Sequence, residues 1–503
     1  MATRFFARKF VHYRTKIRSS VLAALESLIE RIVIPRAAKK WVPTTPDERW
    51  LGQRVLFVGY GSPIGRLGHK VVAQHIRNLG GEAEHLLPIE VCPTYSRHWR
   101  KNEDAPGQLF DTASALTDFL VTHSRGEYFF KRGLIDEYIR RAPRSFFIGR
   151  NWLPDAFLEM AHRVLDDAGK LMAKYSALVL VDTAYLQKSS LVSAAKSQGK
   201  PVWALDPAGG WRKIADADKD RLERDWFSAA EQAIRKRTDV LIEAKEYARN
   251  RFAGNVGSDI DVHFVYGAAA SYGEDEPRKV LFLHAIRDSA GLPLKQTDRG
   301  ELFATFLEWA SQALEYVAEE PGSWWIKPHP QKFLFPDENK IVQELMAEYA
   351  IPIEILRPDL NTKWVLSNRL PIYTHSGTIA VEAAVHGYRA HVCSGMYSDR
   401  ISQVSSTLDE MARNYRLPFA DAAENIDDPK DVGIAQILLF QRFQLAATEL
   451  SPTAIPNFRS STNSFELAER RQTFELLWRY RKRPAQVTAR KIAHEILNHT
   501  TVS

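Results

Sequence analysis

The feature that most constrains the fold is a series of short apolar runs separated by helical patterns. The series starts near residue 54 and starts again at residue 279. The first series opens with the run RVLFVGYG and continues with apolar runs at 145–149, 177–182 and 201–206. Helical patterns lie between these runs, at 67–78, 155–174 and 186–197. Buried strands that alternate with helices are typical of a doubly wound sheet, in which helices cover both faces of parallel strands.

The second series opens with KVLFLH at 279–284 and predicts further strands at 323–327, 352–356 and 389–393. Its helical patterns lie at 299–318 and 339–349. A long polar helix at 216–250 and a passage rich in Gly, Ala and Ser at 254–277 separate the two series. A chain of 503 residues is too long for one core. The sequence therefore predicts an α/β protein with two Rossmann-like domains in series.

The predicted domains have four parts. Residues 1–45 form a basic helical leader, residues 50–270 the first Rossmann-like domain and residues 278–455 the second. The chain closes with helices over 456–503, and the helical patterns of the C-terminal region lie at 434–447, 465–483 and 487–498.

Charge is concentrated in the leader. The chain carries a net charge of +7, and its first 43 residues hold ten Lys or Arg and two Asp or Glu. The rest of the chain, with 58 basic and 59 acidic side chains, is close to neutral. This distribution differs from the overall basicity of nucleic-acid-binding proteins, so no nucleic acid is expected as a partner.

The leader is also amphipathic, because Phe6, Phe10, Tyr13 and Ile17 recur at helical spacing among basic residues. No apolar run approaches the roughly 20 residues that span a bilayer, and no signal-peptide pattern is present. Basic amphipathic helices lie on anionic membranes, but they also pack on a protein body or a partner subunit. Contact with the inner membrane surface therefore stays an open alternative.

The two cysteines, Cys92 and Cys393, are far apart and show neither a metal nor a disulfide signature. A reducing compartment is the simplest interpretation, and it predicts a cytoplasmic protein that can be peripheral on the inner face of the membrane. No metal and no cofactor is expected.

The first strand runs into the glycine-rich turn GYGSPIGRLGH at 59–69. A dinucleotide fingerprint would need glycine at Ile64, so NAD is not the preferred ligand. The glycines at Gly61, Gly65 and Gly68 still allow close approach of the backbone. Together with His69 they predict contact with an acceptor sugar or a phosphate, and tight-turn packing is the equal alternative.

Polar residues follow two strands of the second domain. His284 and Asp288 come directly after the strand at 279–284, where a cleft would lie in an open α/β sheet. The alternative is a loop held by its own hydrogen bonds. Lys327 and His329 follow the strand at 323–327 in the sequence IKPHP. Because proline fixes φ and restricts the residue before it, His329 is expected to be positioned before any ligand arrives.

A third cluster is THSGTIAVEAAVHG at 374–387, a polar knuckle between a strand and a helix. His375 or Ser376 is expected to cap the helix, leaving first-turn N–H groups and the Ser376 and Thr378 hydroxyls to bind an anion. Glu382 lies on the same helix face as Thr378, and a carboxylate there suits the hydroxyls of a ribose. The alternative is a well-capped helix with an exposed glutamate.

Together, LFLHAIRDSA at 281–290, IKPHP at 326–330 and the knuckle with Gly377 resemble the nucleotide-binding half of bacterial surface-polysaccharide glycosyltransferases. The most similar group is the capsule polysaccharide biosynthesis family that includes β-Kdo transferases. The resemblance covers roughly residues 279–395. It implies a GT-B fold, in which an acceptor domain and a donor domain face a cleft, and metal-independent transfer from a nucleotide sugar, with a CMP-sugar favoured over a UDP-sugar. It also implies that Lys327 and His329 neutralise the leaving group, that Ser376 and Thr378 hold phosphate and that Glu382 holds ribose.

The sequence departs from that family in lacking a clear acidic catalytic motif in the first half. Asp182 and Asp206, which end predicted strands, are candidates for the base or for acceptor binding. Two alternatives on the same fold are a glycerophosphate-type transferase and a UDP-sugar epimerase. A third is a non-catalytic nucleotide-binding or scaffold protein of a polysaccharide export complex. For the transferase, the expected partners are a nucleotide sugar and a glycan or lipid-linked acceptor.

Overall fold

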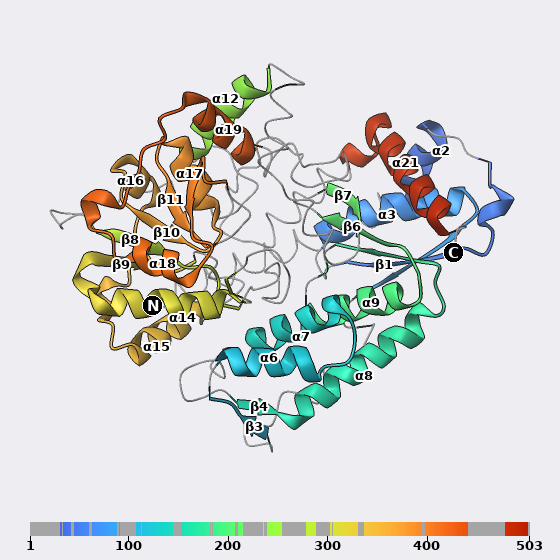
Figure 1. Ribbon diagram of the computed structural model, residues 1–503. Coiled ribbons are helices and arrows are strands. Elements are labelled where there is room, and N and C mark those ends of the chain that lie inside the picture. Colours follow the sequence, from blue (N-terminus) through green and yellow to red (C-terminus); the bar gives the residue numbers. More distant parts are fainter. Residues whose placement is uncertain are drawn as a thin grey trace, which may run out of the picture.

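The computed structural model describes residues 31–32, 34–41, 45–59, 63–87, 90, 107–111, 113–143, 152–181, 183, 185–206, 210–214, 235, 239–253, 278–287, 302–303, 305–329, 337–393, 398–440 and 478–500. These residues form two sheets with helices on both faces, which lie side by side in Figure 1. The predicted α/β class with parallel sheets is confirmed. Among the described residues, no helix is both long enough and apolar enough to cross a membrane.

The first sheet has the strand order β2-β1-β5-β6-β7. Its strands are β1 (Arg54–Val58), β2 (Glu82–Leu86), β5 (Ala177–Leu180), β6 (Val202–Asp206) and β7 (Gly210–Lys213). All neighbours pair in parallel except β7, which is antiparallel to β6. The sequence predicts the central strands because they are apolar on both faces, as strands covered by helices must be.

Side chains of the first sheet alternate between two apolar layers. Val55 and Phe57 point into a layer formed with α3 (Pro63–Asn78) and α21 (Arg483–Thr500). Leu56 and Val58 point the other way, towards α7 (Tyr128–Arg141), α8 (Asp155–Met172) and α9 (Tyr185–Ser197). The chain's last helix thus returns to the first sheet (Figure 1).

Smaller elements complete this half. The helix α2 (Ile34–Trp41) packs on α3 and α21, and the short helix η2 (Glu48–Trp50) follows it. The helix α6 (Ala113–His123) lies against α7. The strands β3 (Gly107–Leu109) and β4 (Trp152–Pro154) form an antiparallel ribbon that lies against α8.

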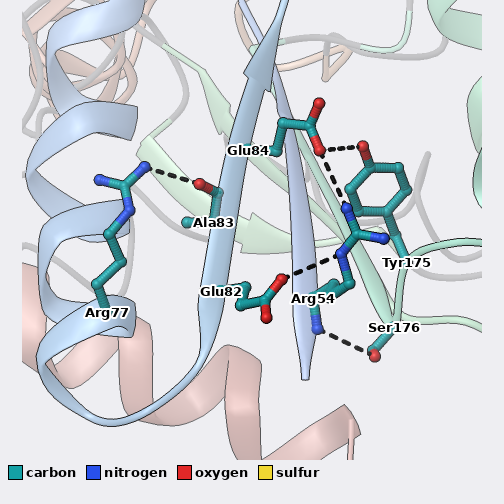
Figure 2. Close-up of polar contacts among 7 residues, drawn as sticks. All are labelled: Arg54, Arg77, Glu82, Ala83, Glu84, Tyr175 and Ser176. Carbon is teal, nitrogen blue, oxygen red and sulfur yellow. Dashed lines mark hydrogen bonds and ion pairs between the residues drawn. The ribbon is translucent and has the colours of Figure 1, made fainter. Parts of the chain in front are cut away.

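The amino-terminal edge of the first sheet is tied by polar contacts around Arg54 (Figure 2). Its guanidinium lies 3.2 Å from Glu82 and 3.3 Å from Glu84, both on β2. The Tyr175 hydroxyl donates to Glu84 at 2.5 Å, and burial together with this carboxylate raises the pKa of Tyr175 to about 12. The ion pairs are largely exposed and contribute little stability. They link the starts of β2 and β1 to the turn before β5.

The second sheet is entirely parallel, with the order β12-β11-β10-β8-β9. Its strands are β8 (Lys279–Phe282), β9 (Trp324–Lys327), β10 (Ile372–Thr374), β11 (Ala390–Val392) and β12 (Ser402–Val404). Counted along the chain, the strand order is 2-1-3-4-5, and the first sheet has the same order. This is a doubly wound arrangement.

Helices cover both faces of the second sheet. One face carries α14 (Phe306–Glu319), α15 (Glu338–Glu348) and α18 (Leu408–Tyr415), and its apolar layer is continuous with that under α7 to α9 of the first sheet. The other face carries α16 (Thr362–Ser367) and α17 (Thr378–Val385), with α12 (Val240–Phe252) and α19 (Pro429–Phe440) packed outside α17. Short helices η4 (Pro321–Ser323), η5 (Ile353–Ile355) and η6 (Phe419–Asp421) join these elements.

The structure differs from the sequence expectations at several elements. The strand predicted at 352–356 is wrong: the chain forms the 3-10 turn η5 there, and Leu356 alone bridges to Ile326. Pro352 offers no N–H to a neighbouring strand, which favours a turn. The helix predicted from 299 begins at Phe306, because the Thr305 side chain accepts from the Glu308 N–H as its N-cap.

Other expectations meet the limits of the described residues. The strand at 145–149, and most of the helical patterns at 216–250 and 465–483, lie outside them. The described part of the long polar helix is α12. The sequence places it in the first domain, whereas it packs on α17 and α19 beside the second sheet.

Candidate functional site

Each sheet has a topological switch point where a ligand can bind. After β1 the chain enters α3 on one face of the first sheet, and after β5 it enters α9 on the other. In the second sheet, β8 leads to α14 on one face and β10 leads to α17 on the other. The connections leave neighbouring strands in opposite directions, and in open α/β sheets ligands bind at the carboxyl ends of such strands.

Two of the predicted motifs meet at the switch point of the second sheet. His284 lies two residues beyond the end of β8, and the knuckle begins where β10 ends at Thr374. A Cβ on Gly377 would lie 3.6 Å from Nε2 of His284, and the rings of His284 and His375 have centroids 6.5 Å apart. The structure therefore brings together residues almost a hundred positions apart in the sequence.

The knuckle is built around Gly377, which is the N-cap of α17. Its N–H donates to Oγ1 of Thr374 at 3.3 Å, and a Cβ there would lie only 2.8 Å from the same oxygen. The expectation that His375 or Ser376 caps the helix is wrong, since no side chain caps it. The two side chains contact each other instead, with 3.1 Å between His375 Nδ1 and Ser376 Oγ.

His375 is fully buried and packs against aromatic rings of α14, including Phe306 at 5.4 Å and Trp309 at 5.9 Å between centroids. Burial, assisted by the positive charge of Arg132, lowers the pKa of His375 to about 3, so the imidazole is neutral at pH 7. A neutral histidine in an aromatic layer positions its neighbours. Ser376 is also buried, whereas Thr378 is half-buried at the start of α17.

Arg132 is a charged residue near the knuckle that the sequence patterns do not single out. It belongs to α7 of the first sheet and forms a buried ion pair with Asp136, 2.8 Å away. Its charge acts on His375, which belongs to the second sheet. The residue was missed because α7 is not amphipathic: apolar and charged residues are buried on all its sides.

His284 is half-buried, and its ring stacks on Phe306 with centroids 4.0 Å apart and an interplanar angle of 2°. Its predicted companion Asp288 lies outside the described residues. The stacking fixes the plane of the imidazole at the end of β8.

The IKPHP motif ends β9, which is the other neighbour of β8. Lys327 is buried, and its ammonium donates to the carbonyl of Leu360, so its charge contacts a backbone group rather than open solvent. His329 is partly exposed, and burial together with Lys327 lowers its pKa to about 4. At pH 7 it is a neutral imidazole, which can donate one hydrogen bond but carries no charge.

Glu382 is buried, so the alternative of an exposed glutamate is wrong. Its Oε1 accepts from Nε of Arg251 on α12 at 3.0 Å, and the two side chains are only 4% and 6% exposed. Glu382 thus joins α17 to α12. Any contact with a ribose would have to share this carboxylate with Arg251.

In the first sheet, Gly65 and Gly68 lie in the first turns of α3, and Gly61 and Asp182 lie outside the described residues. His69 is fully buried against Phe57, with ring centroids 5.5 Å apart. Burial lowers its pKa to about 4, against the opposing effect of the Leu180 carbonyl. His69 thus packs between α3 and the sheet, as the alternative of turn packing expects.

The first sheet can also be compared with a dinucleotide-binding site. A ribose-binding acid would stand at the carboxyl end of the second strand, but β2 ends at Leu86. Its two acids, Glu82 and Glu84, face Arg54 near the opposite edge (Figure 2). Asp206 is the last residue of β6.

Among the described residues, no group of three His, Cys, Asp or Glu side chains is arranged to hold a metal ion, and Cys393 is buried. No protein-family model matches the chain, and no curated protein is significantly similar to it.

Proposed function

We propose that the protein is a glycosyltransferase of bacterial surface-polysaccharide biosynthesis, acting on capsule or lipopolysaccharide. It transfers a sugar from a nucleotide sugar, with a CMP-sugar favoured and a UDP-sugar as the alternative, to a glycan or glycolipid acceptor without a metal. The reaction takes place on the cytoplasmic side of the inner membrane, where the basic leader contacts the membrane surface.

The observation that carries this proposal is the meeting of His284 with the Gly377 knuckle at the switch point of the second sheet. Nucleotides bind at such switch points in open α/β sheets. Gly377 allows the tight turn against Thr374 from which α17 starts, and the half-buried Thr378 hydroxyl lies in the first turn of that helix, where a phosphate can be bound.

The proposed arrangement is of GT-B type, with the first sheet carrying the acceptor and the second carrying the donor. Two features support it: both sheets have the same strand order, and α21 returns from the end of the chain to the first sheet. A donor on the second sheet would lie close to Arg132, the residue of α7 whose charge already acts on His375.

In the proposed mechanism, hydrogen-bond donors stabilise the charge that develops on the departing nucleotide. His329 donates to it as a neutral imidazole, and Lys327 and Arg132 are the candidate cations. Each of the two also has a partner within the protein, the Leu360 carbonyl for Lys327 and the Asp136 carboxylate for Arg132. Asp182 remains the candidate base. Replacing His329 with alanine should lower turnover about 10²-fold if it donates to the leaving group. Turnover close to that of the wild type would contradict this role.

Thermal shift measurements against CMP, UDP and CDP test the donor class. We expect CMP to raise the melting temperature most. A preference for UDP would select a UDP-sugar transferase or an epimerase, and a preference for CDP a glycerophosphate-type transferase. No stabilisation by any of the three at millimolar concentration would refute a nucleotide site and favour a scaffold protein of an export complex.

A further inference from the structure

The outer helices of the first sheet carry basic residues from both ends of the chain. Residues 31–41 contain four Lys or Arg, residues 478–491 contain six, and neither segment contains an acidic residue. In the fold, α2 packs against α21 beyond α3, so the two basic segments belong to one outer layer (Figure 1).

Both helices of this layer bury their apolar sides and expose their basic ones. In α2, Ile34 and Ala38 are buried, whereas Arg36 and Lys39 are exposed. In α21, Ala489, Ile492 and Ile496 are buried in the apolar layer of the first sheet.

The exposed side of α21 presents Arg483, Val487 and Lys491, spaced four residues apart along one face. Because the buried sides of both helices face the sheet, their basic sides face away from it. These two helix faces with residues 478–482 are called the basic face below.

Apolar groups are exposed among these cations. Trp478 is 48% exposed, and the Arg481 guanidinium lies over its ring, 3.2 Å from the centroid. Val487 is 48% exposed and Ile32 is 40% exposed. A tryptophan and aliphatic groups surrounded by Lys and Arg are the composition of protein surfaces that lie in the headgroup region of anionic membranes.

We propose that the basic face docks on an anionic phospholipid surface. Residues 1–30, which precede α2, are not its occupant, because they carry six Lys or Arg and only two Asp or Glu and would be repelled. The acidic groups closest to the face lie towards the end of α21 that is farther from residues 478–482, where the exposed Glu495 follows Lys491 on the same helix face. Asp47 pairs with Arg49, and this pair lies near His494, towards the other end of α21.

The basic face would also orient the molecule on a membrane. If the face lies on the membrane, the first sheet is the membrane-proximal half, since α2 and α21 both pack on it. This inference depends on the proposed membrane location but not on the transferase reaction, and it adds α21 and residues 478–482 to the contact made by the leader, to which α2 belongs.

The test is flotation of the full chain with vesicles of phosphatidylcholine alone or mixed with phosphatidylglycerol. The variant carries Lys482→Glu, Arg483→Glu and Lys491→Glu, all at exposed positions. The matched control makes the same change of charge at exposed lysines beside the second sheet, with Lys245→Glu, Lys363→Glu and Lys430→Glu.

Each basic residue near an anionic surface raises the affinity for that surface by roughly fivefold to tenfold. The triple variant should therefore bind mixed vesicles about 100-fold more weakly than the wild type. The control should bind within about twofold of the wild type, and rising salt should weaken wild-type binding. Trp478→Ala, which changes no charge, should weaken binding severalfold.

The proposal is overturned if the triple variant floats like the wild type, if the control loses as much binding, or if pure phosphatidylcholine binds equally well. Tighter binding to a single-stranded RNA oligomer than to mixed vesicles would also overturn it. Thermal shift with CMP, measured on the same variants, distinguishes the transferase proposal from the membrane proposal. If CMP does not stabilise the protein, the nucleotide site is refuted, and the flotation result still decides whether the basic face binds the membrane.

Discussion

The buried pair of Arg251 and Glu382 yields the sharpest prediction, because its two roles have different consequences. The resemblance assigns Glu382 to a ribose, whereas in the structure it accepts from Arg251 at 3.0 Å. Arg251 lies at the end of α12, and Glu382 lies in α17, which starts at the Gly377 knuckle. We expect the pair to act as a tether that holds α12 against the helix of the site.

The expected magnitude follows from burial. The side chains are 6% and 4% exposed, so removing one leaves the other charge buried without its partner. Such a change costs about 3–5 kcal/mol. At roughly 2–4 °C per kcal/mol for a domain of this size, Glu382→Gln or Arg251→Met should lower the melting temperature by about 6–20 °C.

The assay is a double-mutant cycle followed by thermal and denaturant unfolding. The double variant Arg251→Met with Glu382→Gln leaves no unpaired buried charge, so it should be more stable than the sum of the single changes predicts, by about 1–3 kcal/mol. CMP affinity, measured well below the melting temperature, should be similar for Glu382→Gln and Arg251→Met, because both act through α17.

Two results would refute the tether. One is a pair of single variants that each melt within about 1 °C of the wild type, a shift well below the expected range. The other is a large loss of CMP affinity in Glu382→Gln that Arg251→Met does not share. That second result would restore Glu382 to the ribose.

Two further predictions concern packing and pH. Gly133→Ala should destabilise the protein by about 1–3 kcal/mol or more in a urea titration, because its Cβ would lie 2.5 Å from Cβ of Ser189 where α7 meets α9. The control Gly169→Ala has open space around the new Cβ and should stabilise the protein by about 0.5–1 kcal/mol in the same titration. Burial lowers the pKa of His375 to about 3 and that of His391 to about 4, so the unfolded chain binds their protons first as the pH falls below 6.5. The contribution of these two histidines to stability should be constant above that pH and fall by about 1 kcal/mol per histidine and pH unit between 6.5 and 4. A stability that does not change between pH 6.5 and 5 would contradict the burial of both rings.

The fold was predictable where strands are apolar on both faces. The central strands β1, β5 and β8 have that composition, and so does β9, an edge strand whose side chains are all buried; the sequence locates each of the four. The edge strand β2 is polar, EAEHL, because its side chains are partly exposed and contact Arg54, so periodicity does not identify it. The periodicity of a sequence reflects which residues are buried. A partly exposed edge strand such as β2 is instead specified by its pairing with one neighbouring strand, which periodicity does not reveal.

The site was predictable only in part, for a similar physical reason. The knuckle is recognisable because Gly377 serves a local purpose, the close approach to Thr374 within the same turn. The partner of Glu382 is 131 residues away, and Arg132 acts from the other sheet, so no local pattern contains either contact. Local sequence therefore predicts the turns of a site. It does not predict the partners of the charged residues, because these partners come from distant parts of the chain.

Strand order determines how the three motifs could act on one ligand. β8 lies between β9 and β10, so His284 stands between His329 on one side and Thr378 on the other. Neighbouring strands are about 4.8 Å apart, which places the outer two motifs about 10 Å apart at the level of the backbone. Side chains from both sides can reach a group above β8, but a phosphate above β9 or β10 would be within reach of only two motifs. If all three motifs serve one nucleotide, its phosphate therefore lies over the end of β8, and His284 is the residue nearest to it.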